Sequence, residues 1–424
     1  MSSFGNKDDR PSILLLCDFS IENPPDFLHQ QLRLIPNELV VWLVARQTKN
    51  SPLNMADAAT QLIEYKDSKI DYILYRFFRR FKFIRGVETI FQPHSTMKIF
   101  ALILKTKPKI VHVHGLGGRM FPTILIPLVR LLTKCEVIIT HHGFSPLNAG
   151  LKLYPNELQR LANFSVSKML EDWLTNVSPA NNQKDYSLNL SSRLLRFTVW
   201  LINHATINIA ISNMQSNIFA LYGIRVDCVI HNSCTICSCS TNDSETNLPH
   251  IKNEKIGILF SGRPIGKGLE RVVNLAKRNE KIHLFLVGYA ASEEFVKLSG
   301  LQSNQYTFLG YVKKDFLYPL IHSMHFVSCL SDCFDNFPTV ALEAIYHGSI
   351  PIVSSSTGVS EIIHSINPQM VWPSHSNFDD ELLEKLLSNR KQILSAIGNS
   401  DFNDYFTQSA LKLTDIYRQA MKQG

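Results

Sequence analysis

This sequence has little cysteine for its length, no long tract of glycine or proline, and no long apolar stretch at its start. Eight scattered cysteines in 424 residues do not make the dense framework of a secreted disulfide scaffold, which favours a reducing compartment. The apolar stretch at 13–17 is too short for a signal-peptide core or a membrane span. We therefore expect a cytoplasmic protein without extended disorder.

The length and the order of apolar segments predict an α/β protein with two domains, since 424 residues suit two cores of about 200 residues each. Short apolar runs at 12–17, 39–45, 110–114, 136–140, 206–211 and 227–231 alternate with helical patterns, which indicates parallel sheets. The same alternation restarts after residue 250. We expect Rossmann-like domains at 1–232 and 253–400, a linker at 233–252, and a terminal helix within 401–424 that crosses back onto the first domain.

The positive charge is concentrated in one segment. Between residues 66 and 109 there are eleven Lys and Arg against three acids, a local net charge of +8 in a chain whose total is +7. Within 73–85, aromatic residues alternate with five cations: Arg76, Arg79, Arg80, Lys82 and Arg85. This pattern suits a helix that docks on an anionic membrane surface. A solvated helix whose aromatics pack on the domain is the alternative, and no nucleic-acid module accompanies the segment.

A glycine-rich turn follows the apolar strand at 255–260. Gly262, Arg263 and Lys267 lie in this turn, and a helical pattern begins at Leu269. Glycines let backbone N–H groups approach a phosphate, the helix N-terminus favours an anion, and the two cations add full charges. The turn therefore predicts a diphosphate site, although a tight loop with exposed cations would have the same composition.

A second polar segment at 335–348 combines a loop with a short helix. It begins with Asp335, Asn336, Phe337, Pro338 and Thr339, and Glu343 follows among apolar residues of the helix. Helical side chains lean toward the N-terminus, so Glu343 can reach the pocket that Asp335 faces. Free N–H groups at the helix start can hold a phosphate. In the alternative interpretation Asp335 is only an N-cap and Glu343 lies on the surface.

Two further features bear on metals. No Asp-x-Asp motif is present, so nothing suggests a diphosphate bridged by a metal, and Arg263 and Lys267 would take its place. Cys234, Cys237 and Cys239 are close together, but a structural zinc site needs four ligands and no second pair has suitable spacing. We expect neither a metal nor another cofactor.

The motifs, taken in order, resemble family-4 retaining glycosyltransferases, which have the GT-B fold. The resemblance rests on 262–268, 287–288, 308–312 and 335–344 in the second half, and on 110–115, 138–143, 209–213 and 230–232 in the first. It spans nearly the whole chain and implies a cleft between the two domains that holds a nucleotide-diphosphate sugar.

The resemblance also implies roles for individual residues. Arg263 and Lys267 match the pair that grips the donor diphosphate, and Glu343 matches the acid expected on the ribose. Asp335 matches the acid expected near the transferred sugar, where the family has Glu. His142 matches a histidine expected near the donor sugar and the acceptor, with His141 as the nearer alternative. The loop after the first strand has no glycine here, unlike in the family.

These observations predict a retaining, metal-independent transfer of a sugar to a lipid-linked or saccharide acceptor, in cell-surface polysaccharide or lipopolysaccharide biosynthesis. The protein would be cytoplasmic and peripheral on the cytoplasmic membrane face, and would not bind nucleic acid. A nucleotide-sugar epimerase on the same fold, or a degenerate nucleotide-sugar-binding scaffold protein, remains the alternative.

Overall fold

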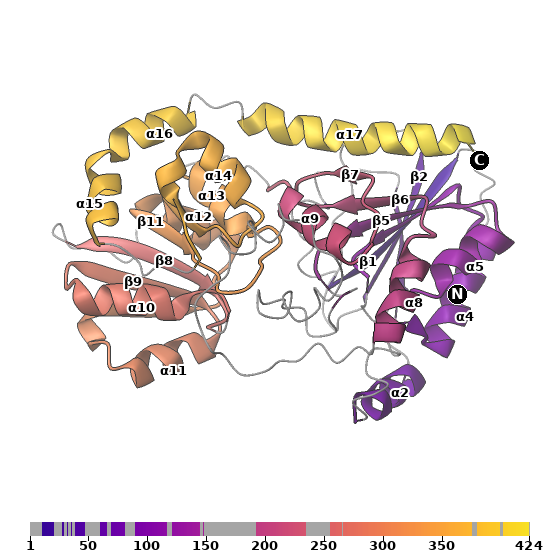
Figure 1. Cartoon of the computed structure of the whole chain (residues 1–424), viewed down its shortest axis with the longest axis horizontal. Coiled ribbons are helices and arrows are strands. Elements are labelled where there is room, and N and C mark those ends of the chain that lie inside the picture. Colours follow the sequence, from indigo (N-terminus) through magenta and orange to yellow (C-terminus); the bar gives the residue numbers. More distant parts are fainter. Residues whose placement is uncertain are drawn as a thin grey trace. The chain divides into compact units, whose positions relative to one another are not determined.

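The structure is a computed structural model, and its chain forms two compact units (Figure 1). Unit 1 comes from Met1–Leu151, Tyr186–Thr235 and Asn403–Gly424, and unit 2 takes the remainder. The structure describes residues 11–20, 28, 32, 35, 39–46, 60–65, 69–80, 90–116, 121–144, 147, 192–234, 255–264, 266–374, 380–398 and 402–423. Every statement below on either unit refers to these residues.

The described strands of unit 1 form one parallel sheet in the order β3-β2-β1-β4-β5-β6-β7. They are β1 (Ser12–Ser20), β2 (Val40–Arg46), β3 (Thr60–Tyr65), β4 (Ile110–His114), β5 (Glu136–His141), β6 (Ile207–Ala210) and β7 (Cys228–Val229). β4 and β5 are buried along nearly their whole length. Burial on both faces is typical of a parallel sheet covered by helices.

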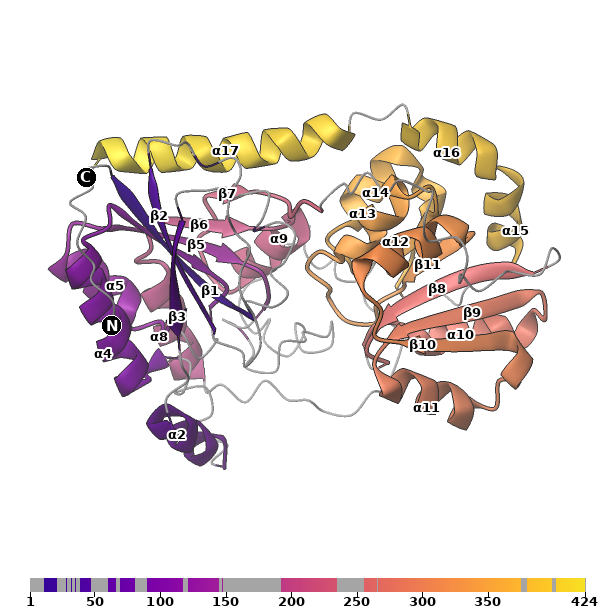
Figure 2. The same ribbon diagram turned by 180° about the vertical axis from the view of Figure 1, so that it is seen from behind.

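Four helices of unit 1 lie together beside this sheet: α2 (Lys69–Arg80), α4 (Pro93–Thr106), α5 (Leu125–Leu132) and α8 (Ser192–Ile202) (Figures 1 and 2). A fifth helix, α9 (Asn213–Leu221), follows β6. Asp71 of α2 caps α4 from outside that helix, because its carboxylate accepts hydrogen bonds from the backbone N–H groups of His94 and Ser95 at 3.2 and 2.8 Å. A carboxylate at a helix N-terminus also interacts favourably with the positive end of the helix dipole.

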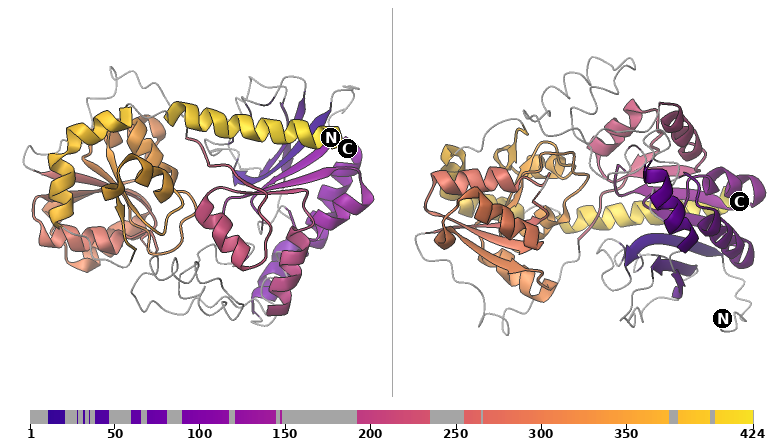
Figure 3. Two further views of the ribbon diagram at one scale, coloured as in Figure 1. Left: turned by 45° about the horizontal axis from the view of Figure 1, so that its top comes forward. Right: turned by 90° about the horizontal axis from the view of Figure 1, so that it is seen from below.

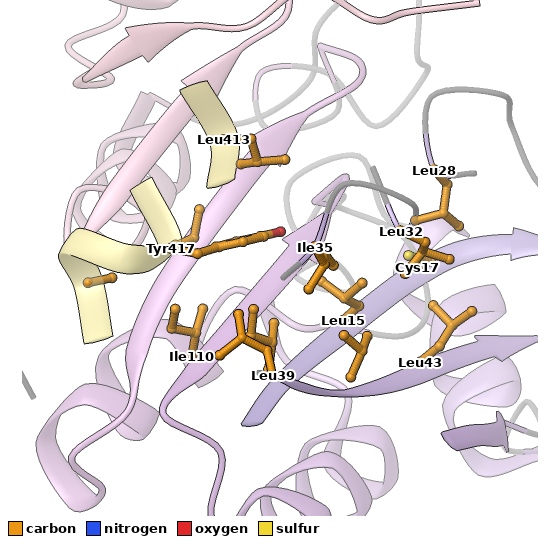
Figure 4. Packing of buried hydrophobic residues seen from close by; sticks show 14 of the residues in the cluster. Leu15, Cys17, Leu28, Leu32, Ile35, Leu39, Leu43, Ile110, Leu413 and Tyr417 are labelled. Carbon is orange, nitrogen blue, oxygen red and sulfur yellow. The ribbon is translucent and has the colours of Figure 1, made fainter. Parts of the chain in front are cut away.

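The terminal helix α17 (Phe402–Gln423) packs on unit 1 (Figures 2 and 3). Leu413, Tyr417 and Ala420 of this helix join a core cluster with residues of several strands and of the segment after β1. Figure 4 shows Tyr417 and Leu413 facing this cluster, which includes Ile110 and Leu15. The predicted return of the C-terminal helix to the first domain is therefore confirmed.

Unit 2 contains a parallel six-stranded sheet in the order β10-β9-β8-β11-β12-β13. Its strands are β8 (Ile256–Gly262), β9 (Ile282–Gly288), β10 (Tyr306–Gly310), β11 (Phe326–Cys329), β12 (Ile350–Ser354) and β13 (Val371–Trp372). Its helices are α10 (Leu269–Arg278), α11 (Ala290–Ser299), α12 (Lys314–Ser323), α13 (Thr339–Tyr346), α14 (Ser360–Ile366), α15 (Asp380–Ser388) and α16 (Arg390–Gly398).

The predicted α/β class with two Rossmann-like domains is confirmed. Two strands had not been predicted, β3 and β13. β3 mixes polar and apolar residues at the sheet edge, and β13 has only two residues, so neither gives an apolar run. The sequence between 144 and 203 also predicts helices at 163–173 and 191–202. The second corresponds to α8, whereas the first lies outside the described residues.

Tyr417 provides a test of how α17 is held. Its side chain is buried and its hydroxyl lies 2.5 Å from Nδ1 of His112 on β4. We expect Tyr417→Phe to lower the free energy of unfolding by about 1–3 kcal/mol, because a buried polar atom loses its partner while the packing stays. Urea denaturation measures the effect. Tyr311→Phe, at a largely exposed side chain, is the control, and equal stability of the two variants would contradict the prediction.

Candidate functional site

The strongest candidate site in unit 2 lies where the strand order reverses. β8 and β11 are neighbours in the sheet, but the chain proceeds outward from β8 to β9 and β10, and from β11 to β12 and β13 on the other side. In open parallel sheets, ligands bind beyond the carboxyl ends of the strands at this switch point. The loops after β8, β11 and β12 meet there, which brings the two predicted polar segments together.

The loop after β8 needs glycine at specific positions. Gly262, Gly266 and Gly268 have φ of 139°, 75° and 77°, in the range that other residues rarely adopt. At Gly268 a Cβ atom would lie 1.8 Å from the carbonyl oxygen of Leu330, so the loop also approaches the backbone after β11 closely. Gly268 is the N-cap of α10 and provides no side-chain cap. The loop therefore leads into a helix N-terminus, which favours an anion.

Lys267 and Asp335 connect the two loops. The ammonium Nζ of Lys267 lies 2.5 Å from Oδ2 of Asp335, and the Ser331 hydroxyl donates to the same oxygen at 3.0 Å. Burial disfavours the Lys267 cation, but the charge and hydrogen bond of Asp335 outweigh this effect, so the pKa of Lys267 lies above its ordinary value. Lys267 therefore carries a full positive charge beside the N-terminus of α10.

The backbone of Asp335 is held by the loop after β12. Its N–H donates to the carbonyl of Ser356 at 3.0 Å, and its own carbonyl accepts from the N–H of Gly358 at 2.8 Å. The buried hydroxyls of Ser354 and Ser356 both donate to the carbonyl of Ser331, at 2.9 and 2.8 Å. Sequence reasoning had missed this serine network, for which the run of small hydroxyl residues at 354–357 was the available signal.

Arg263 is exposed, unlike its partner in the predicted cation pair. Its guanidinium carbon lies 5.0 Å from the ring centroid of Tyr289, which follows β9. A guanidinium held over an aromatic face can still donate hydrogen bonds to an anion. The loop thus presents one cation held by a carboxylate and one held by a ring.

The start of α13 contradicts the alternative interpretation, in which Asp335 is only an N-cap and Glu343 lies on the surface. The N-cap is Pro338, not Asp335, and Pro338 makes no side-chain cap hydrogen bond. Asn336 and Phe337 are buried, whereas Thr339 is partly exposed. Glu343 is only 9% exposed, so it is not a surface residue. The interpretation of Asp335 as a simple N-cap and of Glu343 as a solvated acid is therefore wrong.

Unit 1 also gathers polar side chains near its own switch point, which lies between β1 and β4. Successive residues of a strand point to opposite faces. His112 and His114 of β4 accordingly share the face of Ile110, which packs with α17. Thr140 and His142, at and after the end of β5, lie on this same face. His141 points to the other face, against Phe219 of α9.

The histidines on the α17 face form a connected group. His112 Nε2 lies 2.9 Å from Oγ1 of Thr140, and Nδ1 of His114 lies 3.1 Å from Nε2 of His142. Burial lowers the pKa of His114 to about 3, and burial together with the neighbouring histidines lowers that of His112 and His142 well below the ordinary value. These imidazoles are therefore neutral at pH 7.

His142, rather than His141, lines a pocket of unit 1. His141 is buried, its Nε2 lies 3.1 Å from Oδ1 of Asn208, and burial lowers its pKa to about 4. His142 is partly exposed and lines the pocket with His114 and Thr140, with His231, Asn232 and Ser233 after β7, and with Ser409, Ala410 and Leu413 of α17. Sequence reasoning had not named His114 as a site residue. The available signal was its spacing of four residues from Ile110, which places both side chains on the same face of β4.

No cluster of three or more His, Cys, Asp or Glu suited to a metal ion occurs among the described residues. Cys234 is buried, and Cys237 and Cys239 lie outside the described residues.

Residues 243–400 match the family model of glycosyl transferases group 1. This segment contains the whole Lys267–Asp335 site. No curated protein matches the chain.

Several solved structures share the fold across nearly the whole chain. Sucrose-phosphate synthase from Thermosynechococcus elongatus is 14% identical, with a TM-score of 0.65 over 98% of this chain and 100% of that one. HepE from Anabaena, solved in complex with UDP, is 15% identical, with a TM-score of 0.59 over 97% and 100% of the two chains. A UDP-forming trehalose-phosphate synthase from Burkholderia xenovorans is 12% identical, with a TM-score of 0.62 over 97% and 99%. The chain has the GT-B fold of these proteins.

Two glycines with nearly the same φ allow the backbone cost of a positive φ to be compared with the steric cost of a Cβ atom near Leu330. Gly268 and Gly300 have φ of 77° and 78°, but a Cβ at Gly300 would meet nothing within 4 Å. Alanine at either position carries the left-handed cost of about 1–2 kcal/mol. We expect Gly268→Ala to lower the Tm of unit 2 further than Gly300→Ala, because it must also push away the Leu330 carbonyl. Differential scanning calorimetry measures both, and equal Tm values would refute the close approach.

Proposed function

We propose that this protein is a retaining glycosyltransferase that moves a sugar from a nucleotide diphosphate to a lipid-linked or saccharide acceptor. The observation that carries the proposal is Lys267, held by Asp335 beside the N-terminus of α10 within the segment that matches glycosyl transferases group 1. We further propose a cytoplasmic role in cell-surface polysaccharide synthesis, which the predicted lipid-linked acceptor supports.

The donor diphosphate binds at the loop after β8. In the transfer, C1 of the sugar forms a bond to an acceptor hydroxyl oxygen as its bond to the phosphate oxygen breaks. The electrons of the broken bond remain on the diphosphate, which gains negative charge and takes up the proton that the hydroxyl releases. The Lys267 ammonium, the Arg263 guanidinium and the first N–H groups of α10 stabilise this charge. Because Asp335 and Tyr289 already hold the two cations in place, little reorganisation is needed as the charge develops.

Asp335 is a positioning residue for Lys267 in this proposal, since its Oδ2 is engaged by both Lys267 and Ser331. Glu343 lies on the helix that follows the same loop, and we assign it to the hydroxyls of the ribose. Asn336, Phe337, Pro338 and Thr339 complete the donor site at the start of α13, whose N-cap is Pro338. Gly262 leaves room for the donor at the end of β8.

His142 belongs to the acceptor side of the reaction. Its imidazole is neutral at pH 7 because of burial and the neighbouring histidines, so it can accept a hydrogen bond from a sugar hydroxyl. Its place in the pocket of unit 1 and its contact with His114 support this role. UDP-glucose, which one solved structure of HepE from Anabaena contains, is the first donor to test, and UDP, which another contains, is the first nucleotide to test for binding.

The cation pair gives the main test of the proposed chemistry. We expect Arg263→Ala and Lys267→Ala each to lower turnover of the donor by about 100-fold or more, since each removes charge that stabilises the leaving diphosphate. Radiolabelled transfer and donor hydrolysis measure the turnover. The matched control is Lys277→Ala, which removes an exposed cation from the last turn of α10.

Loss of the fold must be separated from loss of chemistry, because Lys267→Ala leaves a partly buried carboxylate without its cation. The double variant Lys267→Ala with Asp335→Ala removes both charges and should regain thermal stability without regaining turnover. Near-normal turnover in both single variants would overturn the proposed role. Conversion of the donor to its epimer without an acceptor would instead favour an epimerase.

Metal independence gives a second test of the same site. Because Arg263 and Lys267 supply the charge that a divalent cation would otherwise bring to the diphosphate, we expect turnover to continue unchanged in excess EDTA. Donor hydrolysis and transfer are measured before and after chelation. Loss of turnover in EDTA that Mg²⁺ or Mn²⁺ restores would contradict this prediction.

A further inference from the structure

The outer side of the α2-α4-α5-α8 layer is unusually apolar for a protein surface. Ten of the fourteen exposed large apolar side chains of the described residues lie on these helices or, for Phe91, directly before α4. Ile73, Met97, Leu131 and Trp200 represent the four helices, with exposed fractions of 65%, 65%, 78% and 52%. Concentration of exposed apolar groups on one layer marks an interaction surface rather than scattered surface residues.

The charges on the same helices have one sign. Their sequences contain a single acid, Asp71, which is buried and bonded to the start of α4. Exposed cations occur on all four helices, at Lys69, Arg76, Lys98, Lys105, Arg130 and Arg196. An anionic partner would therefore meet no exposed acid on these helices.

The four helices form one continuous layer. α2 packs on α4, α4 on α5, and α5 on α8, and they lie together in both views of the ribbon (Figures 1 and 2). The inner sides of the helices are buried, as at Ile103, Val129 and Leu195. The apolar and cationic groups named above therefore share the outer side of one layer, which we call the helical surface.

We propose that the helical surface binds the face of an anionic lipid bilayer. Apolar side chains interleaved with cations match the boundary between acyl chains and acidic headgroups, where each cation adds to the attraction. Among the described residues, no helix is long and apolar enough to cross a membrane. The attachment is therefore a surface contact, and it does not depend on the proposed glycosyl transfer.

This surface is larger than the segment that the sequence predicted. Of the predicted docking residues, Arg76 is exposed and lies 6.0 Å from the Tyr72 ring centroid. Arg79 and Arg80 are in α2, but their side chains, like Lys82 and Arg85, lie outside the described residues. α4, α5 and α8 were not part of the prediction, because periodicity could not show that their outer sides share one layer with α2.

Two pairs of variants test the proposal with the full chain. The apolar variant is Met97→Ser with Leu131→Ser, and its control is Leu298→Ser with Tyr311→Ser, two positions of unit 2 with exposed fractions of 82% and 74%. The charge variant changes Arg76, Lys98, Lys105 and Arg196 to Gln. Its control changes four exposed lysines of unit 2 to Gln: Lys277, Lys281, Lys313 and Lys391.

Co-sedimentation with vesicles of phosphatidylcholine alone, or with added phosphatidylglycerol, measures binding. We expect wild type and both controls to bind only the anionic vesicles, and less well at high salt, because screening shortens the reach of the charges. The charge variant should lose about 100-fold or more in partition coefficient, and the apolar variant about 10-fold or more. Unchanged Tm and far-UV circular dichroism show that the variants are folded.

Three outcomes would overturn the proposal. Wild type could fail to bind anionic vesicles at low salt. The unit 2 controls could lose as much binding as the variants of the helical surface. The wild type could also form a dimer in sedimentation velocity that the apolar variant abolishes, while vesicles remain unbound, in which case the helical surface is a protein interface.

Discussion

A parallel strand can be followed by a parallel neighbour only through a crossover, and this constraint organises both units. Each crossover returns the chain to the same end of the sheet, so the loops after the strands gather at one edge. In unit 2 this brings the loops after β8 and β11 close enough for Gly268 to meet the Leu330 carbonyl and for Lys267 to bond Asp335. Residues 68 positions apart therefore act as one site.

The same constraint acts in unit 1 through the alternation of side chains. β4 and β5 are adjacent, and their alternate residues place His112, His114 and Thr140 on the face that α17 covers. Burial makes these imidazoles neutral, and His114 and Thr140 line a pocket together with His142, which lies beyond the end of β5. The terminal helix thus covers a polar strip as well as an apolar cluster, and Tyr417 supplies the hydroxyl that the strip needs.

The predictability of each feature follows from the range of the interactions behind it. Strands such as 110–114 and 136–140 were predicted because an apolar run is a local signal, whereas β3 at the sheet edge carries a weak one. The glycine turn and Asp335 were recognised as separate segments, but the bond between Lys267 and Asp335 depends on strand order, which periodicity does not contain. Choosing His142 over His141 required knowing which face of β5 each side chain lies on. The role of Ser331 became visible only from its hydrogen bond to Asp335.

Unit 1 uses the two sides of its sheet differently. The side under α17 combines the apolar cluster of Leu413 and Tyr417 with the histidine group, so the outer helix is held by both packing and hydrogen bonds. On the other side, α4, α5 and α8 bury one apolar stripe and expose a second, as Ile103 and Leu104 show with exposed fractions of 1% and 51%. A stable core requires only the first stripe. The exposed stripe lies outside the buried core, and its concentration beside cations fits the lipid partner proposed above.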